Sequence, residues 1–188
     1  MTSLSSDFTG CSILFYDEAG NQLGSSVITS YSRSSLRVEV MDIPHLLDVG
    51  SVCKLLILSS PSPCEYQGRI IKEGNKRIIA LFFGQEKENR GSTRYIVRFP
   101  ARVENLICDG RAYPLHTPLE IALVNISQSG VRFRTKRETF SDGDRFQMRM
   151  MINNAAKLLI ADVVNHLDKD DGLTEYGCRF LIGSERVV

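Results

Sequence analysis

The segment "LVNISQSGVRFRT" (123–135) decides how the fold of this chain is interpreted. A strand-like apolar run is followed by a short polar stretch that ends in glycine. A second run follows, in which apolar and polar residues alternate. Alternation of this kind is typical of a strand with one buried face. The segment therefore predicts two antiparallel strands joined by a short turn.

A similar segment, "ITSYSRSSLRVEV" (28–40), stands in the first half of the chain. The correspondence continues in order, because "LDVGSVCKLLIL" (47–58) matches the pattern of "FSDGDRFQMRMM" (140–151). Identity is low, but the spacing is kept, which indicates a degenerate internal repeat. The alternative is that any two six-stranded antiparallel barrels share this rhythm.

Strand-like runs with turn signals between them extend over most of the sequence. A hairpin is predicted at Gly74–Asn75, a turn at "DGRAY" (109–113) and another at "KDDG" (169–172). Short strands at intervals of about 8–12 residues suggest an antiparallel barrel or sandwich. We expect an all-β protein with little helix, built as two small six-stranded antiparallel barrels in tandem.

A polar, charged segment flanked by glycine, "GQEKENRGST" (84–93), separates the two series of strands. This composition is typical of a linker. The predicted organisation is therefore a first barrel at 1–84, a linker at 85–93 and a second barrel at 94–188.

Composition and charge exclude several classes of function. The net charge of +1 argues against bulk electrostatic binding to DNA or to an anionic membrane. The first residues lack the pattern of a signal peptide, and the longest apolar run noted, Ile78–Phe83, is too short for a membrane helix. Five cysteines without a CxxC pair suggest a reducing compartment, so a soluble cytoplasmic protein without membrane insertion is expected.

No constellation typical of catalysis or metal binding is visible in the sequence. The three histidines lie far apart, and there is no nucleophile–base set or phosphate-binding loop. We therefore expect no enzymatic activity, no metal and no cofactor. Charge instead gathers in the second half, where residues 90–188 contain 15 Lys and Arg against 12 Asp and Glu.

Two motifs in this second half favour binding of an anion. In "RYIVRFPAR" (94–102), Arg94, Arg98 and Arg102 recur at a spacing of four. The pattern [D/N]-x-S-x-x-G occurs once in the chain, as "NISQSG" (125–130), on the turn between two predicted strands. Either motif alone is weak, but their order within one predicted domain strengthens both.

Taken together, "RYIVRFPA" and "NISQSG" resemble the signature of the PilZ domain, the bacterial receptor module for cyclic di-GMP (c-di-GMP). The resemblance covers about residues 90–185 and includes the closing "YGCRF" strand. It implies a six-stranded antiparallel barrel that binds c-di-GMP through Arg94 and Arg98 of the first motif. The second motif corresponds to Asn125, Ser127 and Gly130, with asparagine where aspartate is more usual in the family.

The chemistry of these residue types suits a cyclic dinucleotide. A guanidinium binds phosphate bidentately, pairs with O6 and N7 of guanine, and stacks on a base. Asn125 offers amide donors and an acceptor, and Ser127 a small donor. Gly130 is expected to permit a positive φ angle and close approach of the ligand. Four other arginines either add to a basic face or, in the favoured interpretation, occupy solvated strand positions: Arg102, Arg132, Arg134 and Arg179.

The first half lacks both motifs, because no arginine precedes Arg33, and Ser30 and Ser35 replace the motif asparagine and glycine. It resembles the N-terminal barrels of flagellar brake proteins of the YcgR type and is expected to be a degenerate PilZ-like barrel. The resemblance implies that ligand binding at the domain junction re-orients the two barrels. A downstream partner would then respond: a flagellar motor protein, a polysaccharide synthase or a regulator that controls motility or biofilm formation.

Other functions are kept as alternatives. A tandem-barrel module that no longer binds ligand and acts through protein contacts is the main one. A nucleic-acid-binding barrel is disfavoured, because aromatic residues make up only 8% of the chain and tryptophan is absent.

Overall fold

The computed structural model describes residues 7–59, 63–82, 93–153 and 155–181. The chain divides into two compact units, Met1–Gly91 and Ser92–Val188. Within the described ranges all helical or strand segments are β-strands, and none is a helix. This confirms the predicted all-β class. No helix that could cross a membrane occurs among these residues. The predicted linker at 85–93 lies, apart from Thr93, outside the described residues.

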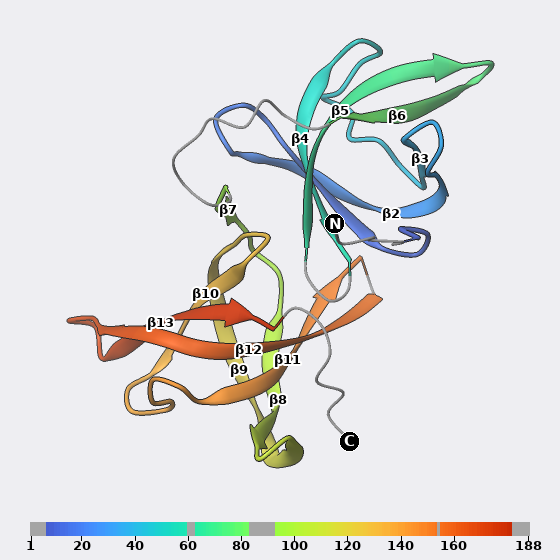
Figure 1. The fold of residues 1–188 in the computed structure, drawn as a ribbon. Helices are drawn as coiled ribbons and strands as arrows, with labels where there is room; N and C mark the ends of the chain where they lie inside the picture. The colour runs from blue at the N-terminus through green and yellow to red at the C-terminus, as the bar shows by residue number, and fades with distance from the viewer. Residues whose placement is uncertain (1–6, 60–62, 83–92, 154, 182–188) are drawn as a thin grey trace. The chain divides into compact units, whose positions relative to one another are not determined.

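The first unit is a closed antiparallel barrel of six strands (Figure 1). Its strands are β1 (Ser12–Tyr16), β2 (Gln22–Ser32), β3 (Arg37–Val40), β4 (Val52–Leu58), β5 (Cys64–Glu73) and β6 (Lys76–Phe82). Around the barrel they follow the order β1-β2-β3-β6-β5-β4. The predicted hairpin is confirmed, because Gly74 and Asn75 alone join β5 to β6 and Gly74 has a φ angle of 58°.

Alternation along the strands builds the core of this barrel. Cys53, Leu55 and Ile57 of β4 point inward and pack in one cluster with Ile13 and Phe15 of β1. Successive side chains of a strand face opposite sides, so every second residue of these runs enters the core. Burying apolar side chains of this size contributes about 1.5–3 kcal/mol each before the entropy of ordering is counted.

The second unit contains six barrel strands and one short additional strand. They are β7 (Tyr95–Ile96), β8 (Ala101–Cys108), β9 (Arg111–Ile126), β10 (Gly130–Lys136), β11 (Arg145–Ile152), β12 (Ala155–Asp168) and β13 (Leu173–Phe180). The order β8-β9-β10-β13-β12-β11 closes on itself through the pairing of β11 with β8. Strand β7 pairs with the end of β9 and was not predicted.

Both barrels connect their strands in the same order. Strands β1 to β6 of the first correspond one by one to β8 to β13 of the second. This is the arrangement that the internal repeat predicts. That the first barrel descends from a PilZ-type domain stays a prediction.

The hairpin between β8 and β9 differs from the expectation. The predicted turn covered Asp109–Tyr113, but only Asp109 and Gly110 form it, with φ angles of 51° and 73°. Two consecutive positive φ angles give a tight turn whose twist suits a hairpin. The residues that follow therefore already belong to β9.

Four aromatic side chains fill the second barrel. Phe133, Phe140, Phe146 and Tyr176 pack with ring centroids 5.2–5.9 Å apart. Tyr176 is fully buried, and its hydroxyl accepts hydrogen bonds from the backbone nitrogens of Thr139 (3.2 Å) and Phe140 (3.3 Å). The hydroxyl therefore fastens the segment after β10 to the core.

Replacing Tyr176 with phenylalanine is expected to lower the free energy of unfolding by about 1–3 kcal/mol. The change keeps the ring but leaves two backbone N–H groups, one of them buried, without their acceptor. Urea denaturation measures the effect. Tyr113→Phe is the control, because Tyr113 is exposed on the surface. Equal losses in the two variants would contradict the assigned role of the buried hydroxyl.

Candidate functional site

Strand β7 brings the arginine segment beside the second motif. It runs antiparallel to β9, with Tyr95 opposite Ile126 and Ile96 opposite Asn125. Strand β8 pairs with β9 only as far as Ile121, so β7 continues along the same edge of β9 beyond that point. The pairing thus places the two motifs, separated in sequence, next to one another.

Alternation fixes which side chains of this segment reach solvent. Tyr95 and Val97 are buried and anchor the segment, whereas Arg94, Ile96 and Arg98 are exposed. The segment from Arg94 to Arg98 is therefore anchored by two buried side chains, Tyr95 and Val97. No hydrogen bond or ion pair joins Arg94 or Arg98 to another described residue.

Asn125 lies at the centre of this arrangement. It is half-buried on β9, opposite Ile96 of β7 on one side and Arg132 of β10 on the other. Its amide forms no hydrogen bond with a described side chain. The side-chain amide of Asn125 thus presents a donor and an acceptor between exposed Ile96 and the positively charged Arg132.

Ser127 is engaged in the turn that joins β9 to β10. Its backbone nitrogen donates to the carbonyl oxygen of Gly130 (2.8 Å), and its hydroxyl contacts the same oxygen (3.4 Å) and the Ser129 hydroxyl (3.3 Å). The Ser129 carbonyl in turn accepts from the nitrogen of Phe180 on β13 (2.9 Å). Because Ser127 is also buried, its first contribution is to the shape of the turn.

The expectation that Gly130 has a positive φ angle is wrong, because it is not among the glycines with this conformation. The reason for glycine is close packing of the backbone. A Cβ at this position would overlap the carbonyl oxygen of Cys178 on β13 and lie 3.1 Å from its carbonyl carbon. Gly130 therefore lets β10 pack closely against β13 at the end of the turn.

The remaining arginines are more engaged than the sequence suggested. Arg132 donates from Nη1 to Oε1 of Glu175 (2.8 Å), and Arg134 donates from Nε to Oε2 of the same carboxylate (3.1 Å). Arg102 donates to Glu104 (3.0 Å). These three arginines lie on strands and remain partly exposed, but each is also held in an ion pair.

Glu175 is a buried carboxylate that sequence analysis missed. Burial has the largest single effect and would raise the pKa of Glu175. The hydrogen bonds from Arg132 and Arg134, together with the charges of Lys169 and Arg132, nevertheless hold this pKa below its usual value. A depressed pKa means that the ionised group stabilises the fold above the pKa of the unfolded chain, about 4.3. This stabilisation is lost as pH falls through the pKa of the folded state.

Glu175→Gln is accordingly expected to lower the free energy of unfolding by about 1–2 kcal/mol at pH 7. The difference from the native chain should shrink below about pH 4, where the native carboxyl also becomes neutral. Denaturant titrations at several pH values test this. Glu120→Gln, at an exposed position of β9, is the control. A difference that does not change with pH would show that charge is not the cause.

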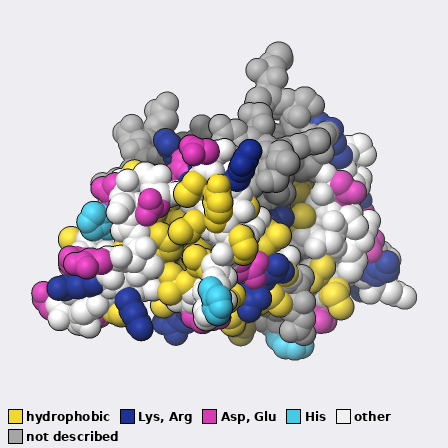
Figure 2. Space-filling view, turned by 90° about the horizontal axis from the view of Figure 1, so that it is seen from below, with side chains coloured by type: hydrophobic (Ala, Val, Ile, Leu, Met, Phe, Trp, Pro, Cys, Tyr) yellow, Lys and Arg dark blue, Asp and Glu magenta, His cyan; other side chains and the backbone are white. Residues whose placement is uncertain are grey.

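Charge on the surface is mixed in sign. Basic and acidic side chains are interspersed over the face seen in Figure 2. Further ion pairs join Arg145 to Asp162 (2.7 Å) and Arg149 to Glu104 (2.6 Å). Within the described part of the chain, no group of three or more His, Cys, Asp or Glu could hold a metal ion.

The second unit is therefore an antiparallel barrel with two exposed arginines, neither paired with another described residue, beside an asparagine at the end of one strand. A family model described as the PilZ domain matches residues 85–187, which is more than half of the chain. The chain belongs to the PilZ domain family.

Comparison with solved structures gives weaker likenesses. The Bacillus subtilis inhibitor of motility (MotI/DgrA) is 11% identical, with 95% of this chain and 90% of that chain covered and a TM-score of 0.38. K. pneumonia MrkH in its c-di-GMP complex is 16% identical, with coverages of 92% and 80% and a TM-score of 0.37. Escherichia coli YcgR in complex with c-di-GMP is 13% identical, with coverages of 92% and 76% and a TM-score of 0.37. These likenesses are too weak to indicate the function of this chain. A search of curated protein sequences finds no match.

Proposed function

We propose that this protein is a cytoplasmic receptor for c-di-GMP without enzymatic activity. The observation that carries the proposal is the pairing of β7 with β9, which sets the Arg94–Arg98 segment beside Asn125 with both arginine side chains exposed. Membership of the PilZ family supports it, because the PilZ domain is the bacterial receptor module for that dinucleotide. The rest of the binding chemistry follows from the residue types.

The ligand offers two phosphodiesters and two guanines. Arg94 and Arg98 bind its phosphate oxygens and stack on its bases, since a guanidinium is planar, always charged and rich in donors. Asn125 hydrogen-bonds a guanine edge or orients one of the arginines. Ser127 and Gly130 belong to the site by holding the turn that follows Asn125 in shape.

A calorimetric titration of the native chain with c-di-GMP, beside a titration with GTP, tests this function. Saturable binding of the cyclic dinucleotide but not of GTP is expected, and the stoichiometry distinguishes one bound dinucleotide from two. The absence of both binding heat and a thermal shift would refute the receptor. The chain would then be a tandem-barrel interaction module, whose partner is sought by pull-down.

The first unit takes no ligand in this proposal. It is a degenerate PilZ-like barrel over 1–84 with the same strand order as the second, and it lacks an arginine pair before its β2–β3 turn. The motif arginines directly follow the linker at 85–93, so ligand binding re-orients the barrels. A downstream protein, such as a flagellar motor protein, a polysaccharide synthase or a regulator, recognises the new arrangement.

Small-angle scattering tests the re-orientation separately from binding. The profile of the ligand-saturated protein is expected to differ from that of the free protein. Arg98→Ala, measured at the same ligand concentration, should keep the profile of the free form. Superimposable profiles of the free and saturated native chain would refute the re-orientation while leaving the receptor intact.

A further inference from the structure

A row of polar positions continues across the barrel from Asn125. Strand pairing places Asn125 of β9 opposite Arg132 of β10, Arg132 opposite Gly177 of β13, and Gly177 opposite Asn165 of β12. The neighbours of Arg132 along the strand, Val131 and Phe133, are buried in the core, so Arg132 projects from the outer face. The four positions form one line over four adjacent strands.

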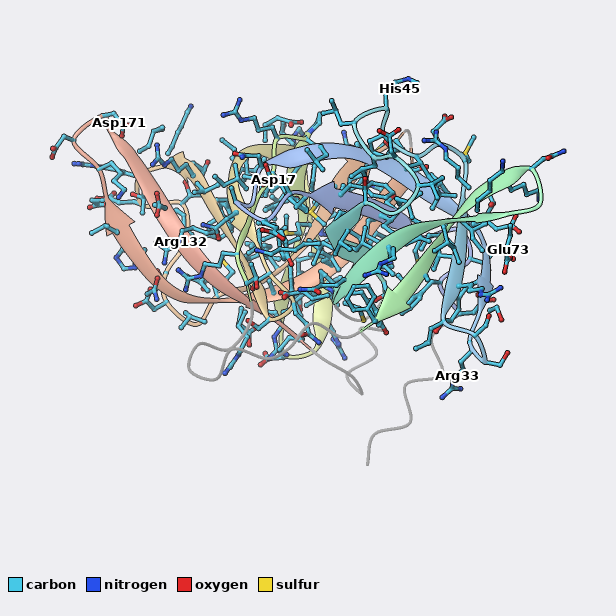
Figure 3. The ribbon with its side chains drawn as sticks, turned by 90° about the horizontal axis from the view of Figure 1, so that it is seen from above. Asp17, Arg33, His45, Glu73, Arg132 and Asp171 are labelled. Atoms are coloured by element: carbon cyan, nitrogen blue, oxygen red, sulfur yellow. The ribbon has the colours of Figure 1, made fainter. Side chains whose placement is uncertain are left out.

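Arg132 is held in place within this row. Its Nη1 donates to Oε1 of Glu175, whose side chain is only 8% exposed, and Arg134 occupies the second oxygen of the same carboxylate. The Arg132 side chain keeps 30% of its surface accessible and is labelled in Figure 3. One edge of the guanidinium is therefore fixed while other N–H groups stay available, which lowers the entropy lost when a ligand binds.

Gly177 leaves the space that Arg132 and Asn165 use. A Cβ on Gly177 would lie 2.5 Å from Oδ1 of Asn165 and 3.6 Å from Nη2 of Arg132. Gly177 has no positive φ angle, so its backbone conformation does not require glycine. The missing side chain instead allows an amide and a guanidinium to lie close together over the bare backbone of β13.

We propose that Arg132 and Asn165, brought together over Gly177, bind a guanine base of c-di-GMP and set the preference for guanine over adenine. This inference rests on the proposed function of the same domain. Guanine presents two acceptors, O6 and N7, to the forked donors of an arginine. Adenine presents an amino donor in place of O6, which a group with donors only cannot accept. Glu175 is the positioning residue that holds the arginine for this contact.

Titration of c-di-GMP and cyclic di-AMP into four proteins tests the inference: the native chain, Arg132→Ala, Gly177→Ala and Arg134→Ala. Arg132→Ala and Gly177→Ala are each expected to weaken c-di-GMP binding by about tenfold or more. The ratio of c-di-GMP to cyclic di-AMP affinity should fall by a similar factor in Arg132→Ala, because the donors of Arg132 provide the discrimination. Arg134→Ala also removes a hydrogen bond to Glu175 but lies outside the row, so its affinities should stay within about threefold of native.

Two variants of the row are used so that weaker binding can be distinguished from loss of folding. Gly177→Ala keeps the Arg132–Glu175 pair and displaces only the flexible amide of Asn165. Thermal melting confirms that each variant is folded. Native-like affinity and discrimination in both Arg132→Ala and Gly177→Ala would overturn this inference and leave the receptor intact. A native chain that binds no c-di-GMP would overturn the proposed function and this inference with it.

Discussion

Replacing Gly130 with alanine is expected to lower the free energy of unfolding by about 3 kcal/mol. The added methyl group would overlap the carbonyl oxygen of Cys178, which is backbone and cannot rotate away. Strands β10 and β13 must then separate at the position where Gly130 pairs with Arg179. Chemical denaturation of the two proteins measures the loss, which is a large part of the stability of an ordinary domain.

Gly177→Ala is the matched control for this prediction, because it adds the same methyl group to β13. There the nearest atom is Oδ1 of Asn165, the end of an exposed side chain that can move. We expect a stability loss below about 1 kcal/mol. A Gly130→Ala protein that keeps native stability but no longer binds c-di-GMP would contradict this prediction. It would indicate that Gly130 contacts the ligand directly.

Local signals were sufficient for much of the fold. The hairpin at Gly74–Asn75 was predicted because two strand-like runs flank a two-residue turn with glycine, and the structure has this turn. The turn at "KDDG" (169–172) is equally confirmed between β12 and β13. In both cases the information lies within a few residues of the turn, which is why a single sequence reveals it.

The extent of β9 could not be predicted in this way. Residues 111–118 are mostly exposed and include Pro114 and Pro118, so neither apolar alternation nor strand propensity marks them. The pairing of β9 with β8 shifts in register between Val103 and Asn105, and Pro114 lies opposite Asn105. Pairing with a neighbouring strand overrides local preference here.

The residues of the candidate site also differ in whether local sequence could predict them. Arg94, Arg98 and Asn125 were found from short motifs, each complete within six residues of sequence. The contact between Arg132 and Glu175 joins residues 43 positions apart and arises only from the pairing of β10 with β13. No periodicity within either strand contains that register, so the sequence alone did not show which charged residues of the two strands would meet.

Arg98→Ala and Arg94→Ala are each expected to weaken c-di-GMP binding by about 30- to 100-fold, because each removes charge-assisted hydrogen bonds to the ligand. Stability should change little, since both side chains are exposed and neither is bonded to another described residue. Calorimetry measures the affinity and thermal melting the stability. Arg111→Ala, an exposed arginine at the other end of β9, is the control and should bind within about twofold of native.

Arg98→Lys separates charge from geometry. Lysine keeps the positive charge but loses the planar fork, so it binds a phosphate as a point charge and cannot pair bidentately or stack in the same way. If Arg98 acts through its fork, Arg98→Lys loses most of the affinity that Arg98→Ala loses. If Arg98 contributes charge alone, Arg98→Lys stays close to native, and the loss in Arg98→Ala diminishes at high salt. Native affinity in Arg94→Ala and Arg98→Ala alike would remove the first motif from the site, even though β7 lies beside Asn125.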